Sequence, residues 1–274
     1  MTLQCKLSIL LRMDSFAFLV TDAERQVQVL REYSLPAPAM LQAGPTLARL
    51  EEVFEEESLL HAPYREVNIA LASPLQTLVP EGFFETSAER SYLEQLTRLG
   101  EESCVRSEHI PPLGAWNVYA YPERPLAFLQ DAFPDARICH LFTPQLISLS
   151  GRMEARESPD ALFLHLWRGY VEPVVYVGGK MIFINLFPVQ HPQDVLYYLL
   201  LGCRQAGREP DDLGLCLLGD LADDSALFAE LCRLDPEIER LSFQREALPE
   251  QGLEEGTLLG FHDLLALEEA FADD

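Results

Sequence analysis

Two stretches of this 274-residue chain begin in the same way: CKLSILLRMDSFAFLVTDAERQVQVLREY at residues 5–33 and ALFLHLWRGYVEPVVYVGGKMIFINLF at residues 161–187. Each consists of three short apolar runs separated by turn residues, such as Gly178–Gly179 in the second stretch. Apolar runs of this length bounded by turns predict consecutive antiparallel strands. A segment of helical period follows each stretch, at 46–60 and at 192–205. The sequence therefore predicts a duplicated α/β fold, two βββαβα halves around a cleft.

The last run of the second stretch, MIFINLF at 181–187, is apolar on both faces, which predicts a strand in the centre of its sheet. Asn185 interrupts this run and either braces neighbouring backbone or lines the cleft. The polar stretch GRMEARESPD at 151–160 indicates the domain boundary. We therefore expect one half at 1–155 and the other at 156–274, with a final helix that either closes the second half or packs back on the first.

Composition excludes several classes of partner. The net charge is −24, from 44 acidic and 20 basic residues, and nucleic acids and anionic membranes both require clustered positive charge. No apolar run reaches the ~18 residues of a membrane span, and the amino terminus does not predict a signal peptide. The six cysteines form no CxxC pair and no zinc pattern, which predicts free thiols in a cytoplasmic protein.

The doubled strand and helix order resembles the actin-like ATPase (ribonuclease H-like) fold of actin, sugar kinases, Hsp70-type chaperones and bacterial cell-division and pilus-assembly proteins. More narrowly, FINLFPVQHPQDVLYYLLLGCRQ at 183–205 and LSILLRMDSFAFLVTD at 7–22 are similar to an uncharacterised family from Bacteroidetes. That family has an actin-like fold and no established activity. The residues that carry the narrow resemblance are Asn185, Phe187, Asp194 and Tyr197.

The resemblance implies where ATP and Mg²⁺ would bind. Active members hold phosphates at the first hairpin of each half through an acidic residue followed by Gly, and a Gly-Gly pair after a later strand contacts the adenosine. The corresponding positions here are Asp14 and Ser15, then Arg168 and Gly169, then Gly219. The first turn lacks a glycine, the second lacks an acid, and the third has one glycine instead of two. Each motif is incomplete, which favours a fold without nucleotide hydrolysis.

These residues also have structural interpretations. Asp14 would cap local N–H groups as an ordinary turn aspartate, and Arg168 would reach solvent. His165 lies in an apolar strand without an evident base partner, which favours a core histidine. Cys139 and His140 are adjacent on a predicted strand, so their side chains point to opposite faces and form no dyad.

Three functions remain open. The first is a non-catalytic interaction or scaffolding protein that has an unidentified protein partner and needs no cofactor. The alternative is a divergent ATP-binding protein, a weak ATPase or kinase, that uses the cleft with Mg²⁺. The third is assembly into a homodimer or filament, with the helix at 46–60 or the final helix as the docking surface.

Overall fold

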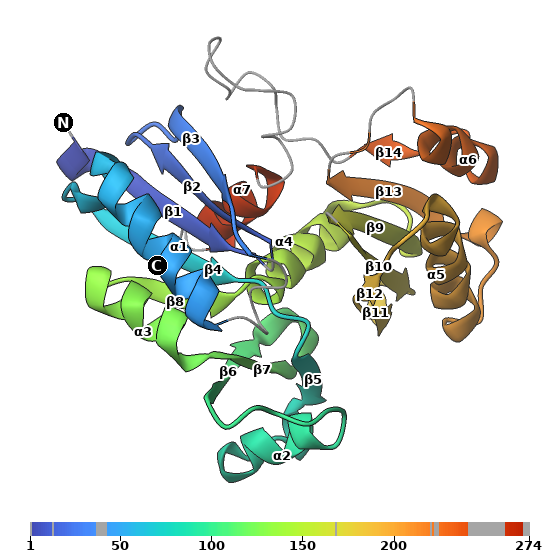
Figure 1. Cartoon of the computed structure of the whole chain (residues 1–274). Helices are drawn as coiled ribbons and strands as arrows, with labels where there is room; N and C mark the ends of the chain where they lie inside the picture. Colours follow the sequence, from blue (N-terminus) through green and yellow to red (C-terminus); the bar gives the residue numbers. More distant parts are fainter. Residues whose placement is uncertain are drawn as a thin grey trace. The chain divides into compact units, whose positions relative to one another are not determined.

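The structure is a computed structural model. It describes residues 2–12, 14–36, 43–167, 169–219, 221, 225–240 and 261–270, without the side chains of residues 167, 261, 262, 269 and 270. The chain divides into two compact units, Met1–Leu149 with Glu246–Asp274 (unit 1) and Ser150–Arg245 (unit 2), both shown in Figure 1. Helix α4 (Phe142–Ala155) passes from unit 1 into unit 2. No helix within the described ranges is long and apolar enough to cross a membrane.

Unit 1 is built on a five-stranded sheet in the order β3-β2-β1-β4-β8. Its strands are β1 (Lys6–Leu11), β2 (Ser15–Thr21), β3 (Val27–Ser34), β4 (Glu66–Leu71) and β8 (Arg137–His140). The first three strands pair antiparallel, whereas β4 pairs parallel with both β1 and β8. The three-strand opening predicted for residues 5–33 is therefore present.

Alternation along β1 gives the sheet two different faces. Leu7, Ile9 and Leu11 belong to the apolar core shared with α1 (Ala43–Glu56) and α3 (Glu123–Ala132). The intervening side chains, Ser8 and Arg12 among them, point to the opposite face. Helix α7 (Phe261–Ala270) packs there against β1, β2 and β4. The last described helix of the chain is thus part of unit 1.

A second, three-stranded antiparallel sheet in the order β5-β7-β6 is inserted into unit 1. Its elements are β5 (Gln76–Pro80), α2 (Glu89–Glu94), β6 (Ser103–Ile110) and β7 (Ala115–Pro122). Helix α2 packs against β5, β6 and β7. Short 3₁₀ turns complete the chain at Thr2–Gln4, Ser58–His61, Glu81–Phe83, Thr86–Ala88, Pro111–Leu113 and Pro210–Asp212.

Unit 2 repeats the topology of the unit 1 sheet, with the order β11-β10-β9-β13-β14. Its elements are β9 (Ala161–Trp167), β10 (Tyr170–Val177), β11 (Lys180–Ile184), β12 (Phe187–Pro188), α5 (Pro192–Gln205), β13 (Gly214–Gly219), α6 (Ala226–Leu234) and β14 (Glu239–Arg240). Strand β9 pairs antiparallel with β10 and parallel with β13. Apolar residues of α5 and α6 cover one face of the sheet.

The prediction that residues 181–187 form a central strand is wrong. Strand β11 is the first strand in the sheet order, and β12 pairs with the same neighbour, β10. The predicted single strand is therefore a broken edge strand, interrupted at Asn185 and Leu186. Asn185 is exposed, and its side-chain oxygen accepts a hydrogen bond from the Leu186 N–H at 2.9 Å. Two apolar faces on an edge strand need an explanation other than burial in the sheet.

Candidate functional site

The β1–β2 turn is the position of the first predicted phosphate site. The Arg12 N–H donates a hydrogen bond to the Ser15 carbonyl at 2.8 Å, and the Leu35 N–H donates to the Asp14 carbonyl at 2.8 Å. Ser15 is buried and Asp14 is half-buried. A phosphate loop requires backbone N–H groups that face the ligand, and in this turn the Arg12 N–H is already bonded to the Ser15 carbonyl.

The Arg12 side chain lies behind this turn and faces into unit 1. Its guanidinium forms an ion pair with Asp263 of α7, and both side chains are almost completely buried. Gln145 of α4 donates a second hydrogen bond to the Asp263 carboxylate at 2.9 Å. The end of β1 therefore serves as an anchor for α7. Sequence reasoning missed this ion pair because Arg12 and Asp263 lie 251 residues apart.

The second and third predicted sites lie in unit 2. Arg168 lies outside the described residues. Gly169 has φ +75° in the β9–β10 turn, with open space where a Cβ would lie, so its backbone conformation explains the glycine. Gly219 has φ +87°, and a Cβ there would lie 2.2 Å from the Leu166 carbonyl oxygen of the neighbouring strand. Gly219 therefore permits the close packing of β13 on β9, which requires no nucleotide.

The described residues of the first and third turns are engaged within the protein, whereas open space lies beside Gly169 in the second turn. The first turn is closed by its own hydrogen bonds, and Gly219 faces protein backbone instead of an open site. The described ranges also contain no group of three His, Cys, Asp or Glu side chains arranged to hold a metal ion. Gly169 and Gly219 thus have backbone conformations that favour glycine, and a phosphate-binding role for Asp14 and Ser15 stays a prediction.

A buried carboxylate that sequence reasoning did not single out connects the two sheets of unit 1. Glu108 of β6 accepts hydrogen bonds from the Tyr119 hydroxyl at 2.6 Å, the His140 N–H at 2.9 Å and the Thr143 hydroxyl. Burial raises the pKa of Glu108, and these hydrogen bonds oppose the rise. A perturbed carboxyl is a common sign of a catalytic site. Here its hydrogen bonds join β6, β7, β8 and α4, which indicates a structural connection.

The two histidines considered in the sequence are core residues. Burial lowers the pKa of His140 to about 4, and its ring nitrogens contact the Phe142 N–H at 3.1 Å and the Ser73 carbonyl at 3.0 Å. His165 lies opposite Glu172 on the neighbouring strand, with 3.6 Å between Nδ1 and Oε2. Both members of this pair are buried. Glu172 is therefore the acidic partner of His165 that the sequence did not reveal.

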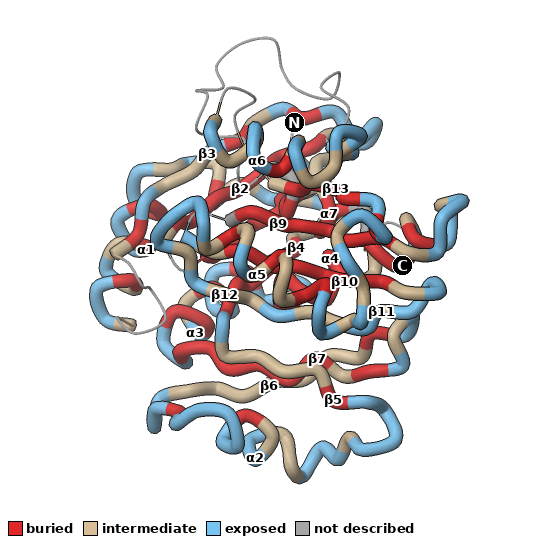
Figure 2. Tube along the Cα trace, turned by 90° about the vertical axis from the view of Figure 1, so that its right-hand side faces the viewer, coloured by how far each residue is buried: buried red, intermediate tan, exposed pale blue. Residues whose placement is uncertain are grey.

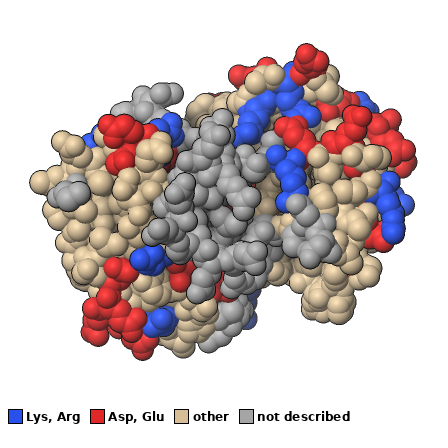
Figure 3. Space-filling view, turned by 90° about the horizontal axis from the view of Figure 1, so that it is seen from above, with Lys and Arg blue, Asp and Glu red and all other residues tan. Residues whose placement is uncertain are grey.

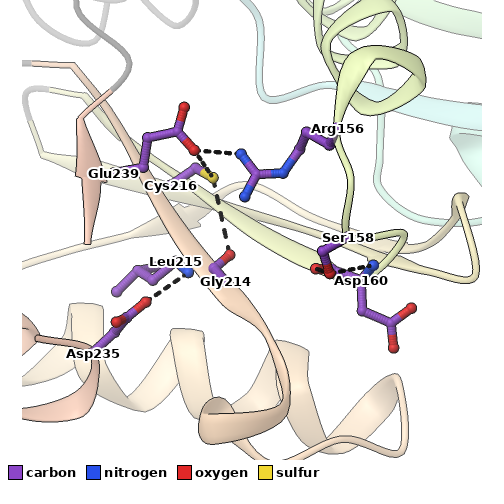
Figure 4. Close-up of polar contacts among 8 residues, drawn as sticks. All are labelled: Arg156, Ser158, Asp160, Gly214, Leu215, Cys216, Asp235 and Glu239. Atoms are coloured by element: carbon purple, nitrogen blue, oxygen red, sulfur yellow. Dashed lines mark hydrogen bonds and ion pairs between the residues drawn. The ribbon is translucent and has the colours of Figure 1, made fainter. Parts of the chain in front are cut away.

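Unit 2 holds a cysteine beside two charged groups, drawn in Figure 4. Glu239 of β14 forms an ion pair with Arg156, and the Cys216 sulfur lies 3.5 Å from the same carboxylate. Burial raises the pKa of the Cys216 thiol to about 12. The thiol is therefore protonated at neutral pH and is no nucleophile. The ion pair instead links the two-residue strand β14 to the segment that follows α4.

An open groove in unit 1 offers a different kind of site. It lies between α1, the 3₁₀ turn at Ser58–His61 and α3, and its volume is about 530 Å³. We call it the α1–α3 groove. Its lining residues are Glu51, Phe54, Glu55, Leu60, His61, Ala62, Phe128, Asp131, Ala132 and Phe133. Volumes of this size are typical of ligand sites in proteins.

The floor of the α1–α3 groove is aromatic and its rim is acidic. Phe54 packs edge-on against Phe128 with ring centroids 4.9 Å apart, and Phe133 lies 5.9 Å from Phe54. Exposed carboxylates surround this floor at Glu51, Glu55 and Asp131, and none of the described lining residues is Lys or Arg. Acidic patches also occur on the face of the molecule in Figure 3. The groove differs from them because its carboxylates surround an apolar floor.

Most of the sequence matches a known family. The profile of the family described as "Protein of unknown function (DUF3822)" matches residues 1–237. The chain belongs to this family. A search of curated proteins gave no match. The DUF3822 assignment confirms the resemblance to an uncharacterised family that the sequence indicated.

Solved structures establish the fold of this DUF3822 member. A Bacteroides thetaiotaomicron protein "with actin-like ATPase fold and unknown function" superposes with a TM-score of 0.78 at 22% identity, covering 97% of this chain and 96% of that one. A chain of the "PilM-PilN type IV pilus biogenesis complex" has a TM-score of 0.57 at 16% identity, covering 99% of this chain and 98% of that one. The chain therefore has the actin-like ATPase fold predicted from its doubled strand order.

Proposed function

We propose that this protein is a non-catalytic interaction protein that binds a basic, apolar peptide segment of a partner protein in the α1–α3 groove. The observation that carries the proposal is the combination of an aromatic floor with the carboxylates of Glu51, Glu55 and Asp131 at its rim. Apolar side chains of a partner would fill the floor, and flanking Lys or Arg side chains would pair with the rim. Such complementarity provides specificity and raises association rates.

Two further observations support an interaction role. Behind the first hairpin turn, where active members of this fold bind phosphate, the Arg12 guanidinium forms an ion pair with Asp263. In addition, one structural neighbour was solved as a complex of two pilus proteins. The alternative, nucleotide binding, is supported by the fold and by the open space beside Gly169.

The test uses a fluorescent peptide of alternating Leu and Arg as the probe, with an otherwise identical Leu and Glu peptide as its control. Binding to the full chain is measured by fluorescence anisotropy. We expect the Arg peptide to bind more tightly than the Glu peptide, with affinity that falls as salt rises, because added ions screen exposed charges.

Variants locate the site. The triple variant Glu51→Gln, Glu55→Gln, Asp131→Asn should weaken Arg-peptide binding about tenfold or more, because each exposed ion pair contributes up to about 1 kcal/mol. A charge-matched control, Glu56→Gln, Glu85→Gln, Glu101→Gln, changes exposed carboxylates that do not line the groove. Equal losses in the two triple variants would refute the groove as the site.

A second variant tests the apolar floor. Ala132→Trp places a large side chain at an exposed lining position and should block the peptide without a change of charge. The nucleotide alternative is tested in parallel by thermal shift with millimolar MgATP. A ligand at about 100 times its Kd adds about 2.7 kcal/mol of stability. Such a shift, combined with no peptide binding, would favour the alternative.

A further inference from the structure

The edge of the unit 2 sheet is apolar, and within the described residues no strand pairs with its outer side. Strands β11 and β12 follow one another along β10, and β11 is the terminal strand of the sheet among the described residues. We call residues 180–188 the β11 edge. An edge strand presents unpaired N–H and C=O groups that can pair with another strand. Natural edges are normally protected against such pairing.

Protection of the β11 edge is confined to its ends and one bulge. Lys180 begins the edge and Pro188 ends it. Between them Ile182 is the extra residue of a β-bulge, because Phe183 pairs with Val175 and Met181 pairs with Tyr176. Ile182 is nonetheless 51% exposed, and Figure 2 shows intermediate and exposed residues along β11. The centre of the edge therefore presents apolar side chains and carries no charge.

Aromatic side chains of α5 extend this apolar surface. Phe187 of β12 stacks on Tyr198 of α5, with centroids 4.1 Å apart and planes 3° from parallel. Tyr197 lies edge-on against Tyr198 and is 62% exposed. Exposed tyrosines beside an apolar patch are common in protein interfaces, because the ring buries a large area and the hydroxyl tolerates water.

Charge indicates which partner can occupy the edge. Residues 173–193 contain no Asp or Glu and form the longest acid-free stretch in a chain with a net charge of −24. Two copies of such a chain repel each other over most of their surfaces. Two copies can approach through residues 173–193, because Lys180 is the charged residue of that stretch and it contains no carboxylate. The β11 edge is therefore a surface through which the chain can meet its own copy.

We propose that two copies of this chain dimerise by antiparallel pairing of their β11 edges around a twofold axis. Pairing centred on Ile182 places Lys180 of each copy opposite Ile184 of the other, so that the lysines do not oppose each other. Like charges directly opposite would destabilise a strand pair. An antiparallel pair of identical strands uses the same surface on both copies, so the assembly closes as a dimer.

The ionic strength dependence distinguishes this interface from the α1–α3 groove. Dimerisation brings together two chains of charge −24 through an apolar edge, so screening should strengthen the dimer. Peptide binding at the groove joins opposite charges, so screening should weaken it. The proposal concerns a separate surface in unit 2 and does not depend on the function of the groove.

Sedimentation equilibrium of the full chain across protein and NaCl concentrations tests the proposal. We expect a monomer–dimer equilibrium whose Kd falls as NaCl rises. Ile182→Asp should raise the dimer Kd at least 100-fold, because it places two carboxylates opposite each other at the centre of the interface. The matched control is Leu96→Asp, the same class of change at a residue that is 67% exposed in unit 1; it should leave the Kd within twofold.

A crosslinking measurement keeps the test independent of any folding defect. In Ile182→Cys the two introduced thiols should be joined by a short bismaleimide, giving a dimer on a denaturing gel, whereas Leu96→Cys should remain a monomer. A chain that stays monomeric at all concentrations would overturn the proposal. A dimer that Ile182→Asp leaves intact would also overturn it.

Discussion

The ion pair between Arg12 and Asp263 should hold α7 on the sheet of unit 1. Asp263 is fully buried, Arg12 is 4% exposed, and the carboxylate also accepts a hydrogen bond from Gln145. Removing one member of a buried ion pair typically costs about 3–5 kcal/mol, because the remaining charge loses its compensation. Domains are stable by only about 5–15 kcal/mol. Asp263→Leu should therefore remove about a fifth or more of the free energy of unfolding.

A double-mutant cycle measures the pair itself. Urea unfolding is followed by circular dichroism for Arg12→Met, Asp263→Leu and the double variant. Each single variant should lose about 3–5 kcal/mol, whereas the double variant should recover much of that loss because neither charge of the pair remains. Hydrogen exchange of β1 and β2 should accelerate in the single variants. Additive losses, with a coupling energy below about 0.5 kcal/mol, would refute the claim that this pair anchors α7.

Two other predictions concern a glycine and a histidine. Gly219→Ala should lower the melting temperature far more than Gly169→Ala does. Both positions have a positive φ, which costs an alanine about 1–2 kcal/mol. Only at Gly219 would the new Cβ also lie 2.2 Å from a carbonyl oxygen. Equal losses would contradict the close approach of β13 and β9. His140 has a folded-state pKa lowered by burial from 6.5 to about 4, so stability should be complete above pH 6.5 and fall as pH drops toward 4. The expected loss in the free energy of unfolding is about 3 kcal/mol. Urea unfolding at pH 7.5 and 4.5 should show that His140→Gln loses less of this free energy than the unchanged chain does. An identical loss in the two proteins would refute the assignment of the pH dependence to His140.

Local sequence patterns predicted the strands of both openings well. The apolar runs in residues 5–33 and the turn residues between them mark these strands, and that information lies within neighbouring residues. The same reasoning placed 181–187 wrongly in the centre of a sheet. An apolar pattern indicates that both faces of a strand can be buried. It does not indicate whether the residues that bury them belong to the same chain.

The candidate sites depend on contacts that sequence patterns do not contain. Asp263 and Arg12 meet through a fold that joins distant segments, and the α1–α3 groove requires Phe54 and Phe128 to pack together from two helices. The acidic face of the helix at 46–60 was visible in the sequence, whereas its apolar neighbour on α3 was not. Glu172 was visible as a carboxylate in an apolar strand, and its partner His165 emerged with the strand register.

The position of α7 on the first two strands also affects how the chain folds during synthesis. Glu268 of α7 accepts hydrogen bonds from Ser8 of β1 at 3.2 Å and from Thr21 of β2 at 2.7 Å. A ribosome adds about 5–20 residues each second, so Ser8 and Thr21 wait on the order of ten seconds or more for this helix. All of unit 2 is translated in that interval. In a nascent chain Ser8 and Thr21 therefore lack these two hydrogen bonds until the last described helix emerges, so the first sheet of unit 1 is completed only after unit 2 has been translated.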